Sequence, residues 1–317
     1  MRRSYQPPLL LLSAIWGSSY MFIKVGVRDF PPASMVEVRL VLAGAVLVAF
    51  LAARRGLRGI RPALKPGAFV GVVGMALPFL LISWGETRVD SGVAAVATSS
   101  VPIFVALLAF RFAASERSSG LRLVGLGIGL AGVGVVAGVH PNGGWWAVAG
   151  ALAVVLAALC YAVSSLFIQR SLVVGGVELA TASVLCGAAA IIPFALARLP
   201  DSVGWKAAAS VAVLGVVGTG IAQLVVNRLI ADHGSARSML VNYLLPGFAL
   251  LYGATILGEP LTVAKVAGLA LILIGVTVAS GLGSRPAAPA RAPGASRPRP
   301  DAARSLDPSA PNPRTPG

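Results

Sequence analysis

The sequence predicts an all-α integral membrane protein with ten transmembrane helices, arranged as two inverted five-helix repeats. Composition, evenly spaced apolar runs and an internal repeat lead to this fold class. Of the 317 residues, 56% are hydrophobic and 12% are charged, and the mean hydropathy is +0.84. Soluble domains carry about 25% charged residues, so this chain has too few charged side chains to cover a water-soluble surface.

Ten apolar runs are expected to span the membrane, because each is close to the ~20 residues that a helix needs to cross the hydrocarbon core. An odd number of spans per half requires the second half to enter the membrane in the opposite orientation, as in many secondary transporters. The expected spans are 8–27, 33–52, 67–85, 92–112 and 121–139 in the first half, and 145–168, 177–197, 206–230, 236–257 and 263–282 in the second.

An internal repeat links the two halves. When Glu116 is set against Glu259, six further positions match without a gap: Gly125, Leu126, Leu130, Gly132, Val133 and Val135 with Gly268, Leu269, Leu273, Gly275, Val276 and Val278. The first spans pair as well, Trp16 with Tyr161, Ser19 with Ser164 and Phe22 with Phe167. Such a repeat indicates one unit built twice, so we expect one repeat over 8–139 and a second over 145–282.

The two ends of the chain are expected to lie outside the bundle. Arg2 and Arg3 precede an apolar run that continues past Trp16 without a small-residue cleavage site, which favours an uncleaved first span over a signal peptide. Residues 283–317 are mostly Pro, Ala, Arg and Ser, so this tail is expected to be disordered in the cytoplasm. Its six arginines are either solvated or in contact with anionic lipid heads.

Loop charges predict the orientation in a cell membrane. If both termini are cytoplasmic, the inner segments hold thirteen Lys or Arg before the tail is counted, and the outer loops hold five. Because Lys and Arg are retained on the cytoplasmic side, this asymmetry favours both termini inside. The formal net charge of +15 is then explained by topology, and no nucleic-acid partner is expected.

The order of several motifs resembles an EamA-type permease of the drug/metabolite transporter superfamily over residues 8–282. The first span reads Trp16-Gly17-Ser18-Ser19-Tyr20 with Lys24 four residues on, and the second carries Arg39. Ser115 stands before Glu116 where the family often has Gly, which loosens the match of that linker. The resemblance implies a ten-helix exporter with a central cavity that works by alternating access. Each half closes with a Pro-bearing span, a Glu and a Gly-rich span: Pro102, Glu116, Gly125 and Gly132, then Pro246, Glu259, Gly268 and Gly275.

Three charged residues lie within the first two spans. Lys24 and Glu37 flank the short outer turn 28–32 at depths of about 5 and 6 Å, so they are able to form a salt bridge. Charges within a span usually face the protein interior or a wet cavity. Glu37 and Arg39 are therefore candidates for a substrate site, and Lys24 with Glu37 for an outer gate. The alternative is snorkelling by Lys24 together with a structural ion pair.

Prolines in the fourth and ninth spans point to a transport site. Each removes a backbone donor and frees the carbonyl four residues back, and interrupted helices at corresponding places in inverted halves mark such sites. A simple kink is the alternative. The residues expected to line the site from these turns are Thr98, Ser100, Pro102, Asn242, Tyr243 and Pro246.

Aromatic and small residues supply two further predictions. Four aromatic residues are expected to form an apolar wall of the site, with hydroxyl or N–H groups that can hydrogen-bond: Trp16, Tyr20, Trp84 and Tyr161. Gly125, Gly129, Gly134 and Gly138 in the fifth span follow the small-xxx-small spacing of close helix contacts, so they are expected to serve helix packing, with a homodimer contact through the Gly-rich fifth or tenth helix as a further option.

These features favour a secondary exporter of small metabolites, amino acids or drugs. The chain has no Gly-x-x-x-x-Gly-Lys-Ser/Thr phosphate loop, so direct use of ATP is not expected. Cys160 and Cys186 have no metal-ligand spacing, and neither a metal nor a cofactor is predicted. A membrane-embedded enzyme is the second interpretation and a sensor or scaffold the third, but an enzyme would need a nucleophile with a base, or a metal cluster.

Overall fold

The computed structural model describes residues 6–112, 120–138, 144–170, 176–234, 238 and 240–280. In these residues the secondary structure is helical, and two of the spans contain a π-helical segment, labelled η. The elements are α1 (Gln6–Gly26), α2 (Pro32–Arg54), α3 (Ile60–Gly71), η1 (Val72–Ala76), α4 (Leu77–Glu86), α5 (Ser91–Thr98), α6 (Val101–Phe112), α7 (Gly120–Gly138), α8 (Gly144–Arg170), α9 (Val177–Leu196), α10 (Trp205–Val213), η2 (Leu214–Ile221), α11 (Ala222–His233), α13 (Val241–Ile256) and α14 (Val263–Ser280).

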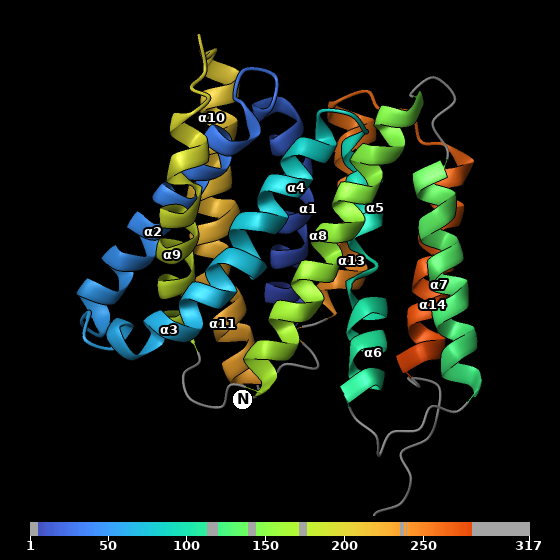
Figure 1. The fold of residues 1–317 in the computed structure, drawn as a ribbon, viewed down its shortest axis with the longest axis horizontal. Helices are drawn as coiled ribbons and strands as arrows, with labels where there is room; N and C mark the ends of the chain where they lie inside the picture. The colour runs from blue at the N-terminus through green and yellow to red at the C-terminus, as the bar shows by residue number, and fades with distance from the viewer. Residues whose placement is uncertain are drawn as a thin grey trace, which may run out of the picture. The chain divides into compact units, whose positions relative to one another are not determined.

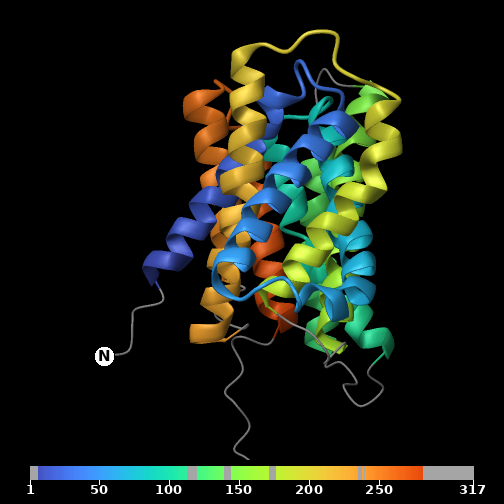
Figure 2. The ribbon, with the colours of Figure 1, turned by 90° about the vertical axis from the view of Figure 1, so that its left-hand side faces the viewer.

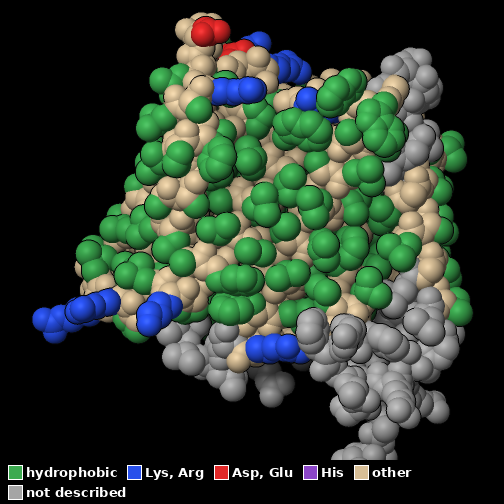
Figure 3. Space-filling model, viewed as in Figure 1, with side chains coloured by type: hydrophobic (Ala, Val, Ile, Leu, Met, Phe, Trp, Pro, Cys, Tyr) green, Lys and Arg blue, Asp and Glu red, His purple; other side chains and the backbone are tan. Residues whose placement is uncertain are grey.

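The helices of residues 1–281 form one compact unit, and they run between two ends that carry the connecting turns (Figures 1 and 2). On the face shown in Figure 3, hydrophobic side chains cover the middle, while Lys and Arg gather at the upper and lower edges. This distribution suits a bilayer, where helices satisfy their own backbone groups and charges remain at the interfaces.

Among the described residues, seven helical segments are long and apolar enough to cross a membrane, and α13 and α14 are shorter apolar helices. The all-helical membrane fold is therefore confirmed at this level, whereas the count of ten spans in two inverted repeats stays a prediction. The seven segments are Gln6–Gly26, Pro32–Arg54, Ile60–Glu86, Ser91–Leu108, Gly144–Arg170, Val177–Leu196 and Trp205–His233.

The third and eighth predicted spans each contain a π-helical segment, η1 and η2, which the sequence analysis did not predict. π-Helical segments are rare and frequently lie at functional sites. Each carries a glycine that approaches a serine of another span. A Cβ on Gly218 would lie 3.1 Å from Ser19 Oγ, and a Cβ on Gly74 would collide with Ser164 Oγ. Ser19 and Ser164 are the pair that the repeat aligns.

Glycines also bring α7 and α14 together. A Cβ on Gly132 would lie 2.9 Å from the Gly268 carbonyl oxygen, and a Cβ on Gly275 would lie 2.6 Å from the Gly125 carbonyl oxygen. The two contacts are reciprocal, because the repeat aligns Gly132 with Gly275 and Gly125 with Gly268. These small faces are thus used within the chain, while the homodimer stays a prediction.

The two proline-bearing spans differ in the structure. The fourth span is interrupted, because α5 ends at Thr98, a turn follows, and α6 begins at Val101. Pro102 thus lies in the first turn of α6, where a backbone N–H would have no acceptor within the helix, so proline is tolerated there. The ninth span is not interrupted within its described helix, since α13 continues through Pro246. The prediction of two corresponding breaks was therefore wrong for α13. Proline is tolerated inside membrane helices when neighbouring groups satisfy the freed carbonyl.

Candidate functional site

Arg39 is a buried cation on α2, with 5% of its surface exposed. Its Nε donates a hydrogen bond of 2.9 Å to Thr219 Oγ1 on η2, and its guanidinium carbon lies 3.7 Å from the centre of the Phe79 ring on α4. The ring face attracts the cation, and the threonine fixes one edge of the planar group. Thr219 is its hydrogen-bond partner among the described side chains, so the two terminal nitrogens remain free to bind a ligand.

Two tyrosines complete the surroundings of Arg39. Tyr20 on α1 and Tyr161 on α8 lie within electrostatic range of the guanidinium, and Tyr20 is buried and lies close to the Thr98 side chain of α5. Side chains from five spans thus meet around one charge. We call this group the Arg39 cluster, and its members are Tyr20, Arg39, Phe79, Thr98, Tyr161 and Thr219.

The structure does not bring every predicted aromatic residue into this cluster. Trp16 packs against the apolar residues that join α1, α11 and α13. Trp84 lies near the end of α4, where the Arg88 guanidinium stacks 3.8 Å above its ring. Ser100 is fully buried, and its hydroxyl donates to the Ala97 carbonyl oxygen at 2.6 Å, so it closes the turn between α5 and α6.

The predicted residues of the ninth span lie on a neighbouring element. α13 packs against α1 and α5. Tyr243 is partly buried and contacts the apolar core that also holds Tyr20, Asn242 is half-buried, and Pro246 is buried inside the helix. Their role in substrate binding stays a prediction.

The expected ion pair between Lys24 and Glu37 is not formed in this structure. The Lys24 ammonium donates to the carbonyl oxygens of Glu86 and Val89, each at 2.7 Å. Glu37 Oε2 is buried and has no hydrogen-bond partner among the described residues. Lys24 therefore binds the end of α4, where carbonyl groups left free by the helix attract a cation.

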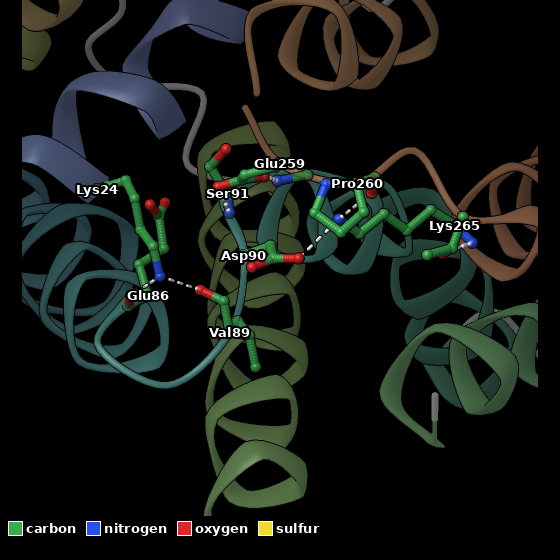
Figure 4. A network of polar contacts seen from close by, with 10 residues as sticks. Lys24, Glu86, Val89, Asp90, Ser91, Glu259, Pro260 and Lys265 are labelled. Carbon is green, nitrogen blue, oxygen red and sulfur yellow. Dashed lines mark hydrogen bonds and ion pairs between the residues drawn. The ribbon is translucent and has the colours of Figure 1, made fainter. Parts of the chain in front are cut away.

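Lys24 belongs to a network of polar contacts at the upper end of the bundle in Figure 1, drawn in Figure 4. The Glu259 carboxylate accepts from the backbone N–H groups of Ser91 at 2.8 Å and Gly92 at 3.2 Å, which satisfies free donors at the start of α5. We call this set the Lys24–Lys265 network; its members are Lys24, Glu86, Val89, Asp90, Ser91, Gly92, Glu259, Pro260 and Lys265.

The same network joins the two halves of the chain. Lys265 Nζ lies 2.7 Å from Asp90 Oδ2 and also donates to the Pro260 carbonyl oxygen at 2.8 Å. Glu259 and Lys265 come from the second half, and Asp90 comes from the first. The network therefore holds the start of α5 against the segment before α14.

Glu86 was missed by the sequence analysis, because the third span was expected to end one residue earlier. It is fully buried at the end of α4, and neither carboxyl oxygen has a hydrogen-bond partner among the described residues. Lys24, Glu259 and Arg39 lie within electrostatic range of it. The signal that could have found Glu86 is an acid that directly follows an apolar run.

No group of His, Cys, Asp and Glu side chains suited to a metal ion is present in the part of the chain that the structure describes. The polar groups of the Arg39 cluster and the Lys24–Lys265 network include a guanidinium, two phenols, hydroxyls and carboxyls. Such a set is able to bind a small polar molecule by hydrogen bonds and charge.

This architecture defines an all-helical, multi-pass membrane protein with a buried charged cluster among its spans. The chain belongs to the EamA-like transporter family, whose model matches residues 8–138 and 148–281. The resemblance found in the sequence is thereby confirmed. The protein is a membrane transporter.

Named relatives agree with this class. The chain is 32% identical to the uncharacterized inner membrane transporter YedA of Escherichia coli K12, over 84% of this chain and 86% of that protein. It is 30% identical to a probable terminal-alkyne amino-acid exporter of Streptantibioticus cattleyicolor, over 84% and 90% of the two chains. A probable amino-acid metabolite efflux pump of Salmonella typhimurium is 26% identical, over 85% and 92%.

A solved crystal structure shares the fold. It is 23% identical to this chain with a TM-score of 0.63, and the match covers 90% of this chain and 100% of that one. Together with the apolar helices, the inner membrane relative places this transporter in the cell membrane, in contact with lipid and a small-molecule substrate.

Proposed function

We propose that the protein is a secondary exporter of small metabolites that carry a carboxylate, such as amino acids, and that Arg39 binds the carboxylate. Transport would proceed by alternating access between two inverted five-helix repeats, residues 8–139 and 145–282, with both termini in the cytoplasm. The observation that carries the proposal is the buried guanidinium, whose two terminal nitrogens bond to none of the residues that the structure describes.

The chemistry of guanidinium supports a carboxylate partner. Its planar fork matches the two oxygens of a carboxylate, and such charge-assisted bidentate pairs are among the strongest hydrogen bonds in proteins. The Phe79 ring and Thr219 hold the group in one orientation. Tyr20 and Tyr161 then supply apolar faces with hydroxyl ends beside the bound molecule.

The position of Arg39 in the repeat supports function over packing. A Cβ on Gly215 of η2 would lie 2.9 Å from the Arg39 carbonyl oxygen, and a Cβ on Gly71 would collide with the Ser183 carbonyl oxygen of α9. Arg39 and Ser183 thus take equivalent places, each against a glycine beside a π-helical segment. The same kind of backbone contact forms whether the side chain is an arginine, as at position 39, or a serine, as at position 183. Packing against the glycine therefore does not require the charge of Arg39.

Reciprocal contacts support the inverted repeats. The glycine contacts between α7 and α14, and those of Gly74 and Gly218 with Ser164 and Ser19, each join residues that the repeat exchanges. The family model also matches the chain twice, over residues 8–138 and 148–281. Alternating access follows from two such units that exchange conformations about a shared site.

The distribution of charge supports the orientation. At the lower end in Figure 1, the described residues include two acids, Glu178 and Asp232, beside a larger group of cations. At the upper end, the acids and bases among the described residues are similar in number. A cationic end faces the cytoplasm, so the Lys24–Lys265 network would close the outer side. The cations at the lower end are Arg54, Arg55, Arg58, Arg61, Lys65, Arg170 and Arg228.

The names of two relatives support the substrate class, since they are described as a probable amino-acid exporter and a probable amino-acid metabolite efflux pump. The test compares the binding of phenylalanine and leucine with that of their decarboxylated amines, on purified wild type and Arg39→Gln. We expect wild type to prefer the carboxylate compounds, and Arg39→Gln to lose this preference. Arg55→Gln is the matched control, because Arg55 pairs with Glu178 at the exposed lower end.

Efflux of the same compounds from proteoliposomes completes the test, with surface amount and thermal stability of each variant measured in parallel. Equal binding of carboxylates by wild type and Arg39→Gln would contradict the proposal. So would an Arg55→Gln variant that loses binding to the same degree, because the effect would then not belong to the buried guanidinium.

A further inference from the structure

One face of α4 carries buried polar atoms that have no hydrogen-bond partner in the part of the chain that the structure describes. Ser83 Oγ and both carboxyl oxygens of Glu86 are buried without a hydrogen-bond partner among the described residues, and both residues are 0% exposed. Native proteins leave few buried polar groups unpaired, and each one calls for an explanation. An unpaired buried carboxyl is especially costly. Two such residues on one helix are therefore candidates to bind a polar ligand.

Helix geometry places these atoms on the same side as the Arg39 cluster. Phe79, Ser83 and Glu86 are spaced i, i+4 and i+7, and residues at this spacing share one helix face. Phe79 carries the Arg39 guanidinium on its ring, 3.7 Å from the centre. The face therefore runs from a cation at one end, through a hydroxyl, to a carboxyl at the other.

We propose that Arg39, Ser83 and Glu86 form a two-ended site for a zwitterion, in which Arg39 binds the carboxylate and Glu86 binds the ammonium group of an α-amino acid. The inference rests on the proposed function and narrows its substrate class. A guanidinium at one end and a carboxyl at the other match the two charged groups of a zwitterion, and Tyr20 lies within electrostatic range of both Arg39 and Glu86.

The length of the face suits a small molecule. Glu86 lies seven positions after Phe79, which corresponds to about 10 Å along the helix. Two hydrogen bonds of about 3 Å each, together with the short separation between the ammonium and carboxylate groups of an amino acid, make up a comparable length. Ser83 lies between the two ends, where its hydroxyl would meet the middle of the ligand.

Lys24 does not already serve as the partner of the Glu86 carboxyl. Its ammonium donates to the backbone carbonyl oxygens of Glu86 and Val89, and Figure 4 shows no contact drawn to the Glu86 carboxyl oxygens. Glu259, the other acid within electrostatic range, accepts from Ser91 and Gly92. The carboxyl of Glu86 thus stays available beside a network whose other charges are satisfied.

Three compounds with the same phenyl ring test the two ends separately. Phenylalanine has both charges, 3-phenylpropionate lacks the ammonium, and phenethylamine lacks the carboxylate. On purified wild type we expect phenylalanine to bind about 10- to 100-fold more tightly than either analogue, since each end contributes a charge-assisted hydrogen bond. The Glu86→Gln variant should bind phenylalanine only as tightly as wild type binds 3-phenylpropionate. Its affinity for 3-phenylpropionate itself should be the same as that of wild type.

Glu178→Gln is the matched control, because Glu178 is an acid at the other end of the bundle, paired with Arg55. Ser83→Ala gives a second variant, expected to weaken phenylalanine severalfold without altering stability. If 3-phenylpropionate binds wild type as tightly as phenylalanine, and still depends on Arg39, the zwitterion site is wrong while the proposed carboxylate exporter stands. If Arg39→Gln binds all three compounds like wild type, the proposed function fails as well.

Two other results would overturn the inference. An equal loss for all three compounds in Glu86→Gln would mean that this residue acts on folding or through Lys24, with no bond to the ammonium. Failure of phenylalanine and leucine to bind wild type, with the protein folded, would exclude α-amino acids as its ligands. The comparison of the three compounds on wild type needs no variant, so it decides the point even if Glu86→Gln does not fold.

Discussion

The single guanidinium of Arg39 shows how a charge is made tolerable inside a membrane protein. An aromatic face, a threonine hydroxyl and two phenols surround it. These groups partly offset the free-energy cost of burying the cation, without an opposite charge in direct contact. A buried side-chain carboxylate in contact with Arg39 would neutralise the cation, and the guanidinium could then no longer bind a substrate carboxylate. Partial satisfaction leaves the group able to exchange one partner for another.

Thr219 tests this arrangement at the level of one residue. Thr219→Val keeps the shape but removes the acceptor of Arg39 Nε, so the guanidinium loses its orientation and one donor is left unpaired. We expect carboxylate binding to weaken severalfold and stability to fall by about 1–3 kcal/mol, measured by ligand titration and thermal unfolding.

Thr255→Val is the control for that substitution, because Thr255 is exposed on α13 and, among the described residues, its hydroxyl donates only to the Leu251 carbonyl oxygen of its own helix. It should change neither property. If both variants bind ligand like wild type, Thr219 does not orient Arg39.

At the scale of elements, glycine contacts decide how closely the spans pack. In membranes, where lipid is as apolar as the side chains, close backbone approach through small residues supplies much of the helix association. α7 and α14 meet in this way over Gly125, Gly132, Gly268 and Gly275. The same device brings the π-helical segments against Ser19 and Ser164.

Gly275→Ala and Gly134→Ala form a matched pair. A Cβ on Gly275 would run into the backbone of α7, whereas a Cβ on Gly134 meets nothing within 4 Å. We expect Gly275→Ala to lower the melting temperature in detergent. Gly134→Ala should leave it unchanged or raise it slightly, since Ala favours a helix over Gly by up to about 1 kcal/mol. Equal melting temperatures would show that α7 and α14 do not need this contact.

The sequence predicted the elements better than it predicted the site. Long apolar runs and a repeat mark spans because bilayer thickness imposes their length. Apolar runs and a repeat do not indicate which face of a span points toward the protein interior. For this reason Phe79, Ser83 and Thr219 were not distinguished from other residues in apolar runs. Tyr20, Arg39, Thr98 and Tyr161 were predicted and do meet. Neither η1 nor η2 contains a proline or a charged residue, so nothing within these segments indicated a π-helix.

At the scale of the whole molecule, the orientation in the membrane follows from charge. Replacement of Arg58 by cysteine places a thiol at the lower end, and replacement of Asp201 places one at the upper end; both positions are exposed. An impermeant maleimide added to intact cells should label the Asp201→Cys variant alone. The native Cys160 is buried and Cys186 is half-buried, so the unsubstituted protein gives the background. Labelling of both variants from outside would contradict the predicted topology.

The glycine seam between α7 and α14 has a consequence for movement. One helix comes from each half of the chain, and their backbones are in contact. The two halves are therefore held together along the line where α7 and α14 meet. Separation there would break close contacts along both helices, whereas rotation about that line would keep them. We therefore expect the opening to widen with distance from this seam, so that residues far from it travel furthest.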